Sequence, residues 1–316
     1  MTVYIIRRLL LMIPSFLVIT LIVFMSVRFI PGSIVDTIEA GLAGVGGIDR
    51  EKVEHILGLD APVHIQYGRW LGGVFRGDLG TSLQKGTPVT QEVIQRLPVS
   101  VELGVFGILI GLIISIPIGV YSAVRQDTVG DYIGRSFAIF CMAVPGFWLG
   151  TLVMVYPSIW WGWTPALEYI PFTEDPEANL LQFLIPAVVL GMALSGVTMR
   201  MTRTMMLEVL KQDYIRTAWA KGLRERIVVI RHALKNALIP IVTIVGLFVP
   251  VIIGGTVIIE QIFVLPGVGR LVLESIQMRD YSLVSGVMFF IAIFILVVNL
   301  LVDLTYTYLD PRVRYQ

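Results

Sequence analysis

Residues 9–27 read LLLMIPSFLVITLIVFMSV, an apolar run without a single Asp, Glu, Lys or Arg. A helix of roughly 20 apolar residues crosses the hydrocarbon core of a bilayer. Arg7 and Arg8 precede the run, as basic residues do in a secretory signal. However, the run is longer than a typical signal core, and no small-x-small cleavage site follows at Arg28. We therefore interpret residues 9–27 as a retained first transmembrane span.

Five further stretches of the chain also lack Asp, Glu, Lys and Arg. They are residues 103–124, 136–167, 178–199, 236–259 and 281–302. Each is long enough to span a bilayer, and we expect the third span to end near Tyr156. The whole chain of 316 residues is 56% hydrophobic and 15% charged, whereas a soluble domain carries about 25% charged residues. The sequence predicts an all-α, polytopic transmembrane bundle with six spans.

Basic residues flank these spans unevenly. With a cytoplasmic N-terminus, 15 Lys and Arg lie on the inner side and 8 on the outer side, with Arg28 at the outer border. Cytoplasmic loops carry the excess of Lys and Arg, so both termini should be cytoplasmic. The chain then divides into an N-terminal end with the first span, an external loop region, and a five-span core with a cytoplasmic loop at 200–237. These parts are residues 1–30, 31–99 and 100–316.

The external segments carry helix and turn signals. Residues 48–57 are expected to form a short helix, and residues 89–97 another that ends at Pro98. Between the last two spans, the Pro266-Gly267 pair and Gly269 mark a turn. The segment that follows, from Arg270 to residue 279, is expected to form a short helix at the external mouth of the bundle.

Small residues and prolines recur inside the spans. Gly107, Gly111, Ser115 and Gly119 are spaced four residues apart in the second span, and a further set comprises Gly146, Gly150, Gly246, Pro250 and Gly254. Such positions either let another helix approach closely or line a pathway, and the spacing favours packing for any single one. Pro145 and Pro250 are among the prolines expected to kink their helices.

The cytoplasmic segment at residues 213–222 has the pattern of a short amphipathic helix. Asp213 is a candidate N-cap, and Gly222 stands where a helix ends in a left-handed residue. The apolar face comprises Tyr214, Ile215, Ala218 and Trp219, and it is surrounded by Arg216, Lys221, Arg224 and Arg226. This helix would lie either on lipid headgroups or in a groove of a cytoplasmic partner. Periodicity alone leaves both alternatives open.

At this segment the sequence resembles a known family. The stretches DYIRTAWAKGL (213–223) and RHALKNALIP (231–240) resemble the cytoplasmic loop of ABC-importer permeases of the dipeptide/oligopeptide class. Their general pattern is Glu-Ala-Ala, three residues, then Gly. Here Arg216, Thr217 and Ala218 occupy the triplet and Gly222 the glycine, so the glutamate is missing, as in the peptide branch. The resemblance extends over nearly the whole chain through RRLL (7–10) with Pro14, LGLD (57–60), GDLGTS (77–82), FVLPGVGRL (263–271), RDY (279–281) and LDPRVRY (309–315).

The resemblance implies a type I ABC-importer permease fold in a bacterial or archaeal cell membrane. The chain would form half of a pathway for di- or oligopeptides, alongside a second homologous permease, in most cases a different chain. An external binding protein would deliver the substrate, and two ATPase subunits would bind ATP and Mg²⁺. No cofactor, metal or nucleic acid is expected on this chain. The residues implied to dock on the ATPase are Asp213, Tyr214, Ile215, Arg216, Thr217, Ala218, Trp219, Ala220, Lys221 and Gly222.

Relatives of this class also move glutathione, nickel and oligosaccharides, so the substrate stays open at this point. Two other classes of function are disfavoured by the residues themselves. An intramembrane enzyme would need a motif such as His-Glu-x-x-His, but the three histidines lie outside the apolar runs. A secondary transporter or channel would place an ionisable residue deep in a span, whereas Glu102, Glu260 and Asp303 lie at span edges. No Gly-x4-Gly-Lys-Ser/Thr motif occurs, so an ATP-driven function needs a separate motor and the chain itself is not expected to be an enzyme.

The charge asymmetry predicts the sidedness of the loops. Single cysteines at Ser82 and at Glu225 should react differently with an impermeant thiol reagent in intact cells. We expect labelling at position 82 only, because residues 31–99 are external and residues 200–237 are cytoplasmic. Labelling at both positions, or at position 225 alone, would contradict this topology.

Overall fold

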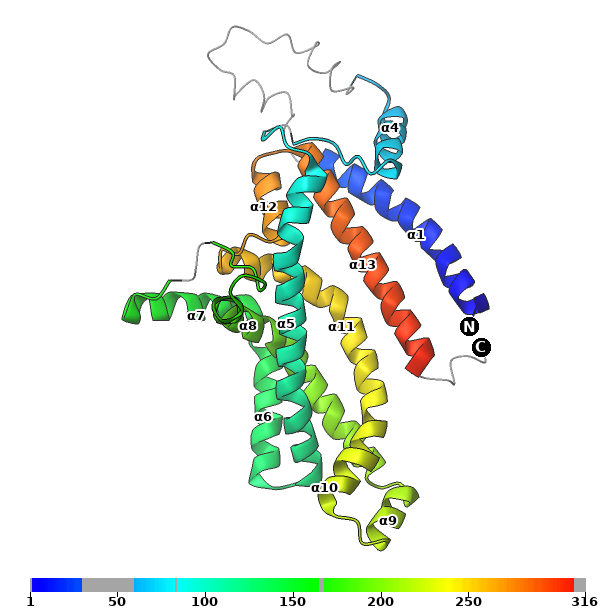
Figure 1. Cartoon of the computed structure of the whole chain (residues 1–316), viewed down its shortest axis with the longest axis vertical. Coiled ribbons are helices and arrows are strands. Elements are labelled where there is room, and N and C mark those ends of the chain that lie inside the picture. Colours follow the sequence, from blue (N-terminus) through cyan, green and yellow to red (C-terminus); the bar gives the residue numbers. More distant parts are fainter. Residues whose placement is uncertain (1, 30–59, 83, 165–167, 310–316) are drawn as a thin grey trace. The chain divides into compact units, whose positions relative to one another are not determined.

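The computed structural model describes residues 2–29, 60–82, 84–164 and 168–309 (Figure 1). The helix expected at 48–57 and residues 310–315 of the terminal motif lie outside this range. The chain divides into two compact units. Unit 1 comprises Met1–Pro98 and Gly267–Val297, and unit 2 comprises Val99–Pro266 and Val298–Gln316. Within the described residues the regular structure is helical, apart from an isolated bridge between Thr81 and Pro88.

The helices follow the apolar runs. Unit 1 contains α1 (Thr2–Arg28), α4 (Val63–Phe75), α12 (Val268–Gln277) and most of α13 (Tyr281–Leu309). The helix α5 (Val89–Val124) begins in unit 1 and continues into unit 2. Unit 2 further contains α6 (Val129–Ala143), α7 (Gly146–Trp161), α8 (Pro176–Val209), α9 (Asp213–Ala220), α10 (Glu225–Ile227), the π-helical segment η1 (Val228–Leu234) and α11 (Lys235–Ile262).

Five of these helices are long and apolar enough to cross a bilayer: α1, α5, α8, α11 and α13. The sixth expected span is divided, because α6 and α7 meet at an angle of 93° (Figure 1). Pro145 lies in this break, where it pushes Val144 into an extended conformation (φ −83°, ψ 120°). The kink expected at Pro145 is confirmed. The count of six spans holds when α6 and α7 are taken together as one broken span, and α7 continues past Tyr156 to Trp161.

The expectation that a helix ends at Pro98 is wrong. The helix α5 runs over 36 residues from Val89 to Val124 and passes through this proline. A proline inside a helix removes one backbone hydrogen bond, and the packing of the flanking turns can offset that loss. Val99 and Leu103, in the turns that follow, are almost fully buried. The boundary expected between residues 99 and 100 therefore falls within a continuous helix.

The small residues of the second span pack against α8. A Cβ atom added to Gly191 of α8 would lie 2.4 Å from the carbonyl oxygen of Gly107, and one added to Gly119 would lie 2.6 Å from the Cβ of Thr202. No side chain fits at such distances, so the two helices reach backbone contact only because these positions are glycine. The packing interpretation of this stripe is confirmed.

Each unit has its own apolar core. In unit 2, one cluster of buried side chains joins α5, α8, α11 and the turn after α11: Val99, Leu103, Phe183, Ala187, Val189, Ile259, Phe263 and Leu265. In unit 1, another joins the start of α5 to α12 and α13: Val89, Val93, Val268, Leu271, Leu283 and Val287. A second cluster of unit 2 surrounds α9 and is described below.

Ser82, the external site for the labelling experiment, is buried in unit 1. A cysteine there would report burial as well as sidedness. Arg76 lies in the same external region and is exposed, so it replaces Ser82 as the labelling site. Glu225 is partly exposed and stays suitable.

The glycine contact between α5 and α8 predicts a steric effect on stability. Gly191→Ala should destabilise the folded chain by roughly 1–3 kcal/mol, because the added methyl group meets a backbone oxygen that does not move freely. Thermal unfolding of the purified protein in detergent measures this effect. Gly254→Ala is the matched control, because a Cβ at Gly254 would meet no atom of another element within 4 Å among the residues that the structure describes. Equal melting temperatures for the two variants would contradict the close glycine contact between α5 and α8.

Candidate coupling site and outer polar network

The helix α9 begins at Asp213, one residue earlier than the sequence predicts. Gln212, with an extended backbone, is the N-cap, and no side-chain hydrogen bond caps the helix. The assignment of Asp213 as N-cap is therefore wrong, and Asp213 is the first helical residue. At that position its carboxylate faces the positive end of the helix dipole and lies 3.4 Å from the Arg216 guanidinium. Both side chains are exposed, so this pair contributes little.

The C-terminal end of α9 is a Schellman turn built on glycine. Gly222 has φ +74°, which confirms the expected left-handed residue. Its N–H donates to the Trp219 carbonyl (2.9 Å), and the Leu223 N–H donates to the Ala218 carbonyl (3.4 Å). A residue with a Cβ would be strained here by roughly 1–2 kcal/mol.

The structure divides the apolar face that the sequence predicts on α9. Ile215 (0% exposed) and Ala218 (6%) are buried within this chain, whereas Tyr214 and Trp219 are each 44% exposed. The two buried residues join a cluster at the ends of α5 and α8 and in η1 and α11: Ala123, Met206, Val228, Val229, Ala233 and Ala237. Half of the predicted face therefore anchors α9 to its own chain. The other residues of 213–222 are exposed, and we call them the exposed surface of α9: Asp213, Tyr214, Arg216, Thr217, Trp219, Ala220, Lys221 and Gly222.

Three polar links hold the elements around α9. The Asn236 amide of α11 donates to the Tyr214 hydroxyl at 2.8 Å. Arg203 of α8 forms a bidentate pair with the fully buried Asp131 of α6, and both N–O distances are 2.8 Å. Arg125 lies 3.3 Å from Glu225 of α10, and both of these are well exposed. In Figure 1, α9 and α10 gather at the end of unit 2 where α6 begins.

The candidate pathway residues have unlike surroundings. A Cβ at Gly150 would lie in ordinary contact, 3.5 Å from Ile262 and Phe263, so this glycine belongs to a packed contact with the end of α11. Within the described part of the chain, a Cβ at Gly254 would meet no atom of another element within 4 Å, and a Cβ at Gly146 would meet the Val189 carbonyl oxygen 4.0 Å away. Gly246 and Pro250 lie within α11. None of these contacts assigns a pathway role.

The expected short helix after the last Pro-Gly turn is present as α12. Gly267 is its N-cap, and the helix runs from Val268 to Gln277 with Gly269 buried. Pro266, which is expected at the external mouth, is the last residue of the unit 2 segment that precedes α12. Arg270 lies on α12, where its Nε is 2.9 Å from Glu274.

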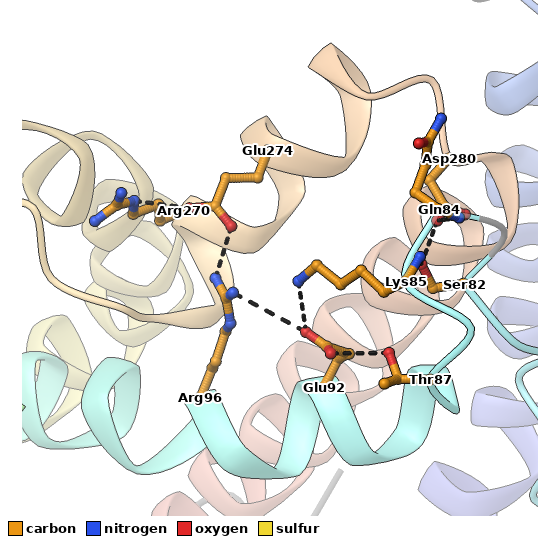
Figure 2. A network of polar contacts seen from close by, with 9 residues as sticks. All are labelled: Ser82, Gln84, Lys85, Thr87, Glu92, Arg96, Arg270, Glu274 and Asp280. Atoms are coloured by element: carbon orange, nitrogen blue, oxygen red, sulfur yellow. Dashed lines mark hydrogen bonds and ion pairs between the residues drawn. The ribbon is translucent and has the colours of Figure 1, made fainter. Parts of the chain in front are cut away.

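A chain of ion pairs joins α12 to the start of α5 within unit 1 (Figure 2). Arg96 lies 2.9 Å from Glu274 and 4.0 Å from Glu92, and Lys85 completes the chain at 2.9 Å from Glu92. These side chains are 13–30% exposed. Partial burial reduces screening, so the network holds α12 more firmly than isolated surface pairs would.

Asp280 connects two motifs that lie 198 residues apart in the sequence. Its buried carboxylate accepts hydrogen bonds from the Ser82 hydroxyl (2.5 Å), the Gln84 N–H (3.3 Å) and the Leu283 N–H (3.1 Å). The last bond caps α13, and the first two hold the loop that follows Gly80 (Figure 2). Arg279 precedes Asp280 in a left-handed conformation (φ +53°), which ends α12 as Gly222 ends α9.

In the loop before α8 in unit 2, the Tyr169 hydroxyl donates a hydrogen bond to the Glu102 carboxylate of α5 at 3.0 Å. Burial, together with this hydrogen bond, raises the pKa of Tyr169 to about 12, so the phenol keeps its proton near neutral pH. Among the described residues, no group of three or more His, Cys, Asp or Glu is arranged to hold a metal ion.

Comparison with known proteins places the chain in a family. Residues 115–315 match the family described as "Binding-protein-dependent transport system inner membrane component", and residues 1–104 match its N-terminal family. The oligopeptide transport system permease AppB of Bacillus subtilis is 40% identical over the full length of both chains. The dipeptide transport system permease DppB of Escherichia coli is 38% identical over 99% of each chain. The chain belongs to this family of binding-protein-dependent transport permeases.

A solved structure supports the fold independently. The inward-facing MetNI methionine ABC transporter contains a chain that superposes with a TM-score of 0.56 at 14% identity. The match covers 70% of this permease and 97% of that chain. The protein is thus a multi-pass permease of the inner membrane with a type I importer fold. Membership of this family of ABC-importer permeases decides against a channel or a secondary transporter. It also decides against an enzyme, because ATP hydrolysis in ABC importers lies in separate subunits.

Several residues at these sites had no sequence signal strong enough to single them out. Asp131 and Arg203 lie far apart in the sequence and in different helices, and nothing in either segment marks them as partners. Asn236 and Asp280 stand inside stretches that resemble the permease class, but the resemblance assigns them no role. Only the fold brings Asn236 to Tyr214 and Asp280 to Ser82.

The three donors around Asp280 predict that its loss loosens the outer loop. Asp280→Ala should destabilise unit 1 by roughly 1.5–3 kcal/mol or more, because buried donors lose a charged acceptor. The measurement is the rate of limited proteolysis of residues 77–88 in the purified permease, together with thermal unfolding. Asp78→Ala is the matched control, because Asp78 is exposed and its carboxylate accepts a hydrogen bond from the nearby Gly80 N–H. Similar losses in the two variants would refute the role of Asp280.

Proposed function

We propose that this permease forms half of a translocation pathway for di- or oligopeptides that an external binding protein delivers. The peptide substrate is supported by the AppB and DppB relatives, which match the permease over its full length. A second, homologous permease would complete the pathway, as a heterodimer, and two ATPase subunits would bind ATP and Mg²⁺.

We further propose that α9 docks on the ATPase. The observation that carries this proposal is the division of its apolar face. Ile215 and Ala218 fasten α9 to the permease, so the short helix is held rigidly and a push on it reaches the rest of unit 2. Trp219 and Tyr214 stay exposed although both rings are large. Exposed aromatic side chains on a rigid element are typical anchors of protein–protein interfaces.

The charges around α9 suit both a partner protein and lipid headgroups. Between residues 211 and 235, the described and exposed cations are Lys211, Arg216, Lys221, Arg224, Arg226, Arg231 and Lys235, against the acids Asp213 and Glu225. An excess of this kind also occurs in cytoplasmic loops that only face anionic lipids. The two possibilities differ in what holds the ATPase, and an experiment separates them.

We also propose that α12, with Pro266, Gly267, Gly269 and Arg270, lies at the external mouth near the binding protein. The proposed division into residues 1–30, 31–99 and 100–316 follows the same topology. The ion-pair network and Asp280 would then keep α12 and the loop after Gly80 in position while the binding protein binds and dissociates.

The docking proposal predicts that Trp219→Glu abolishes ATPase binding. Burying a large aromatic side chain contributes roughly 1.5–3 kcal/mol, and a carboxylate in its place adds a desolvation cost. The measurement is co-purification of the ATPase with the affinity-tagged permease, alongside the amount of permease in the membrane. Trp219 is preferred to Ala218, because an acid at the buried Ala218 would disturb the permease itself.

Lys211→Glu is the matched control. It introduces the same acid on the same exposed segment, two residues before α9, and changes the net charge by a larger amount. The ATPase should stay bound to this variant. If the Trp219→Glu permease retained its ATPase, the docking assignment would be wrong, and α9 would instead be a lipid-facing helix.

A further inference from the structure

The Tyr214–Asn236 hydrogen bond joins the short helix α9 to the long membrane-spanning helix α11. Tyr214 is the second residue of α9, and Asn236 is the second residue of α11, the long helix that includes Gly246, Pro250 and Gly254. The Asn236 amide nitrogen donates one hydrogen bond to the Tyr214 hydroxyl (2.8 Å) and another to the His232 carbonyl (3.0 Å). One side chain thus joins α9 to both α11 and η1.

The element beneath this contact is unusual. The segment η1 is a π-helix of seven residues, Val228–Leu234, which leads directly into α11. Runs of π-helix are rare, because they widen the helix and weaken its packing, and they occur most often at functional sites. The inner side of η1 is pinned by Val228, Val229 and Ala233 against Ile215 and Ala218 of α9. On the exposed side, the Asn236 amide links α11 to α9 through the Tyr214 hydroxyl.

We infer that the Tyr214 hydroxyl and the Asn236 amide form a strut that transmits a displacement of α9 into α11. This inference rests on the proposed docking of the ATPase on α9. The buried apolar contacts hold α9 firmly against η1, and the hydrogen bond on the exposed side adds a directional contact to them. A hydrogen bond fixes direction and distance, and so it resists rotation of α9 relative to α11.

The strut should matter little for folding and much for coupling. Both side chains are exposed in the permease alone, where water competes for the same hydrogen bonds. An ATPase seated on α9 would exclude that water, and the bond would strengthen in a less polar surrounding. Asn236 and Tyr214 are therefore positioning residues, and their effect belongs to the assembled transporter.

The test follows a movement of α11 directly and needs no transported substrate. A cysteine is placed at Leu247, an exposed residue of α11 about 18 Å along the helix from Lys235, in a Cys141→Ala background. The purified complex of permeases and ATPases is labelled with a membrane-permeant maleimide, with and without ATP and vanadate. The measured quantity is the ratio of the two labelling rates.

We expect a ratio different from one in the parent protein. In Asn236→Ala and in Tyr214→Phe the ratio should fall most of the way to one, and the double variant should lose no more than either single variant. Tyr214→Phe keeps the ring and the His232 contact, so it removes the strut alone. Thr204→Val is the matched control, since it deletes an exposed hydrogen bond (to the Arg200 carbonyl) within α8, and it should keep the parent ratio.

The ATPase should co-purify with Asn236→Ala in the parent amount. Loss of the ATPase from this variant would overturn the inference, because Asn236 would then be needed for binding of the ATPase itself. A labelling ratio of one in the parent protein would also overturn the inference. So would single variants that both keep the labelling ratio of the parent protein. Trp219→Glu distinguishes the docking proposal from the strut proposal. If that variant keeps its ATPase, the docking proposal fails and the strut proposal fails with it. If Trp219→Glu releases the ATPase and the strut variants move α11 normally, the strut alone is wrong.

Discussion

Unit 2 depends on the close approach of α5 and α8. Helices in a bilayer gain little from excluding water, so they associate through van der Waals contact and hydrogen bonds, and small residues allow the closest contact. Gly107 and Gly191 bring the two backbones together, and Gly196 does the same for α8 and α6, where a Cβ would lie 2.7 Å from the Ala138 carbonyl. The helix α8 is thereby fixed on two sides, and the chain that leaves its end is fixed with it.

The position of the short helix α9 depends on this rigid contact. A helix of eight residues is too short to be stable alone, because helix nucleation is costly and few backbone bonds repay it. The helix α9 is therefore stabilised by the burial of Ile215 and Ala218 against the rest of unit 2, and it ends in a Schellman turn at Gly222. The Asp131–Arg203 pair holds the start of α6 to α8, three residues before the buried Met206 of the same cluster. The opposite side of α9 stays exposed, and it is small, aromatic and basic.

In unit 1, polar contacts rather than close glycine contacts hold the short elements in position. The loop after Gly80 and the helix α12 have short apolar stretches, and hydrogen bonds to Asp280 and the ion pairs of Arg96 place them. Arg279 adopts a left-handed conformation that usually favours glycine, and the next residue, Asp280, immediately caps α13. Two helix ends are thus joined with almost no intervening loop. This compact junction explains why a charged residue at Asp280 is fully buried.

The amino-acid sequence by itself determined the membrane character, the apolar segments, the break at Pro145, the turn at Gly222 and the family. These features depend on local composition or on a single residue: a charge-free run, a missing N–H, or a residue without a Cβ. The sequence also placed Tyr214, Ile215, Ala218 and Trp219 on one face of α9. It did not determine that two of them turn inward, because the apolar period is the same whether the face meets its own chain or a partner.

Only the tertiary structure decided which distant residues meet. The continuation of α5 through Pro98 follows from packing on both sides of the proline, which outweighs the loss of one backbone hydrogen bond. The pairings of Asp131 with Arg203, Asp280 with Ser82 and Asn236 with Tyr214 follow from the close contacts of whole helices. Directional bonds of this kind depend on distances of a few ångströms between elements, and those distances exist only after the glycines and apolar side chains have set how closely the helices pack.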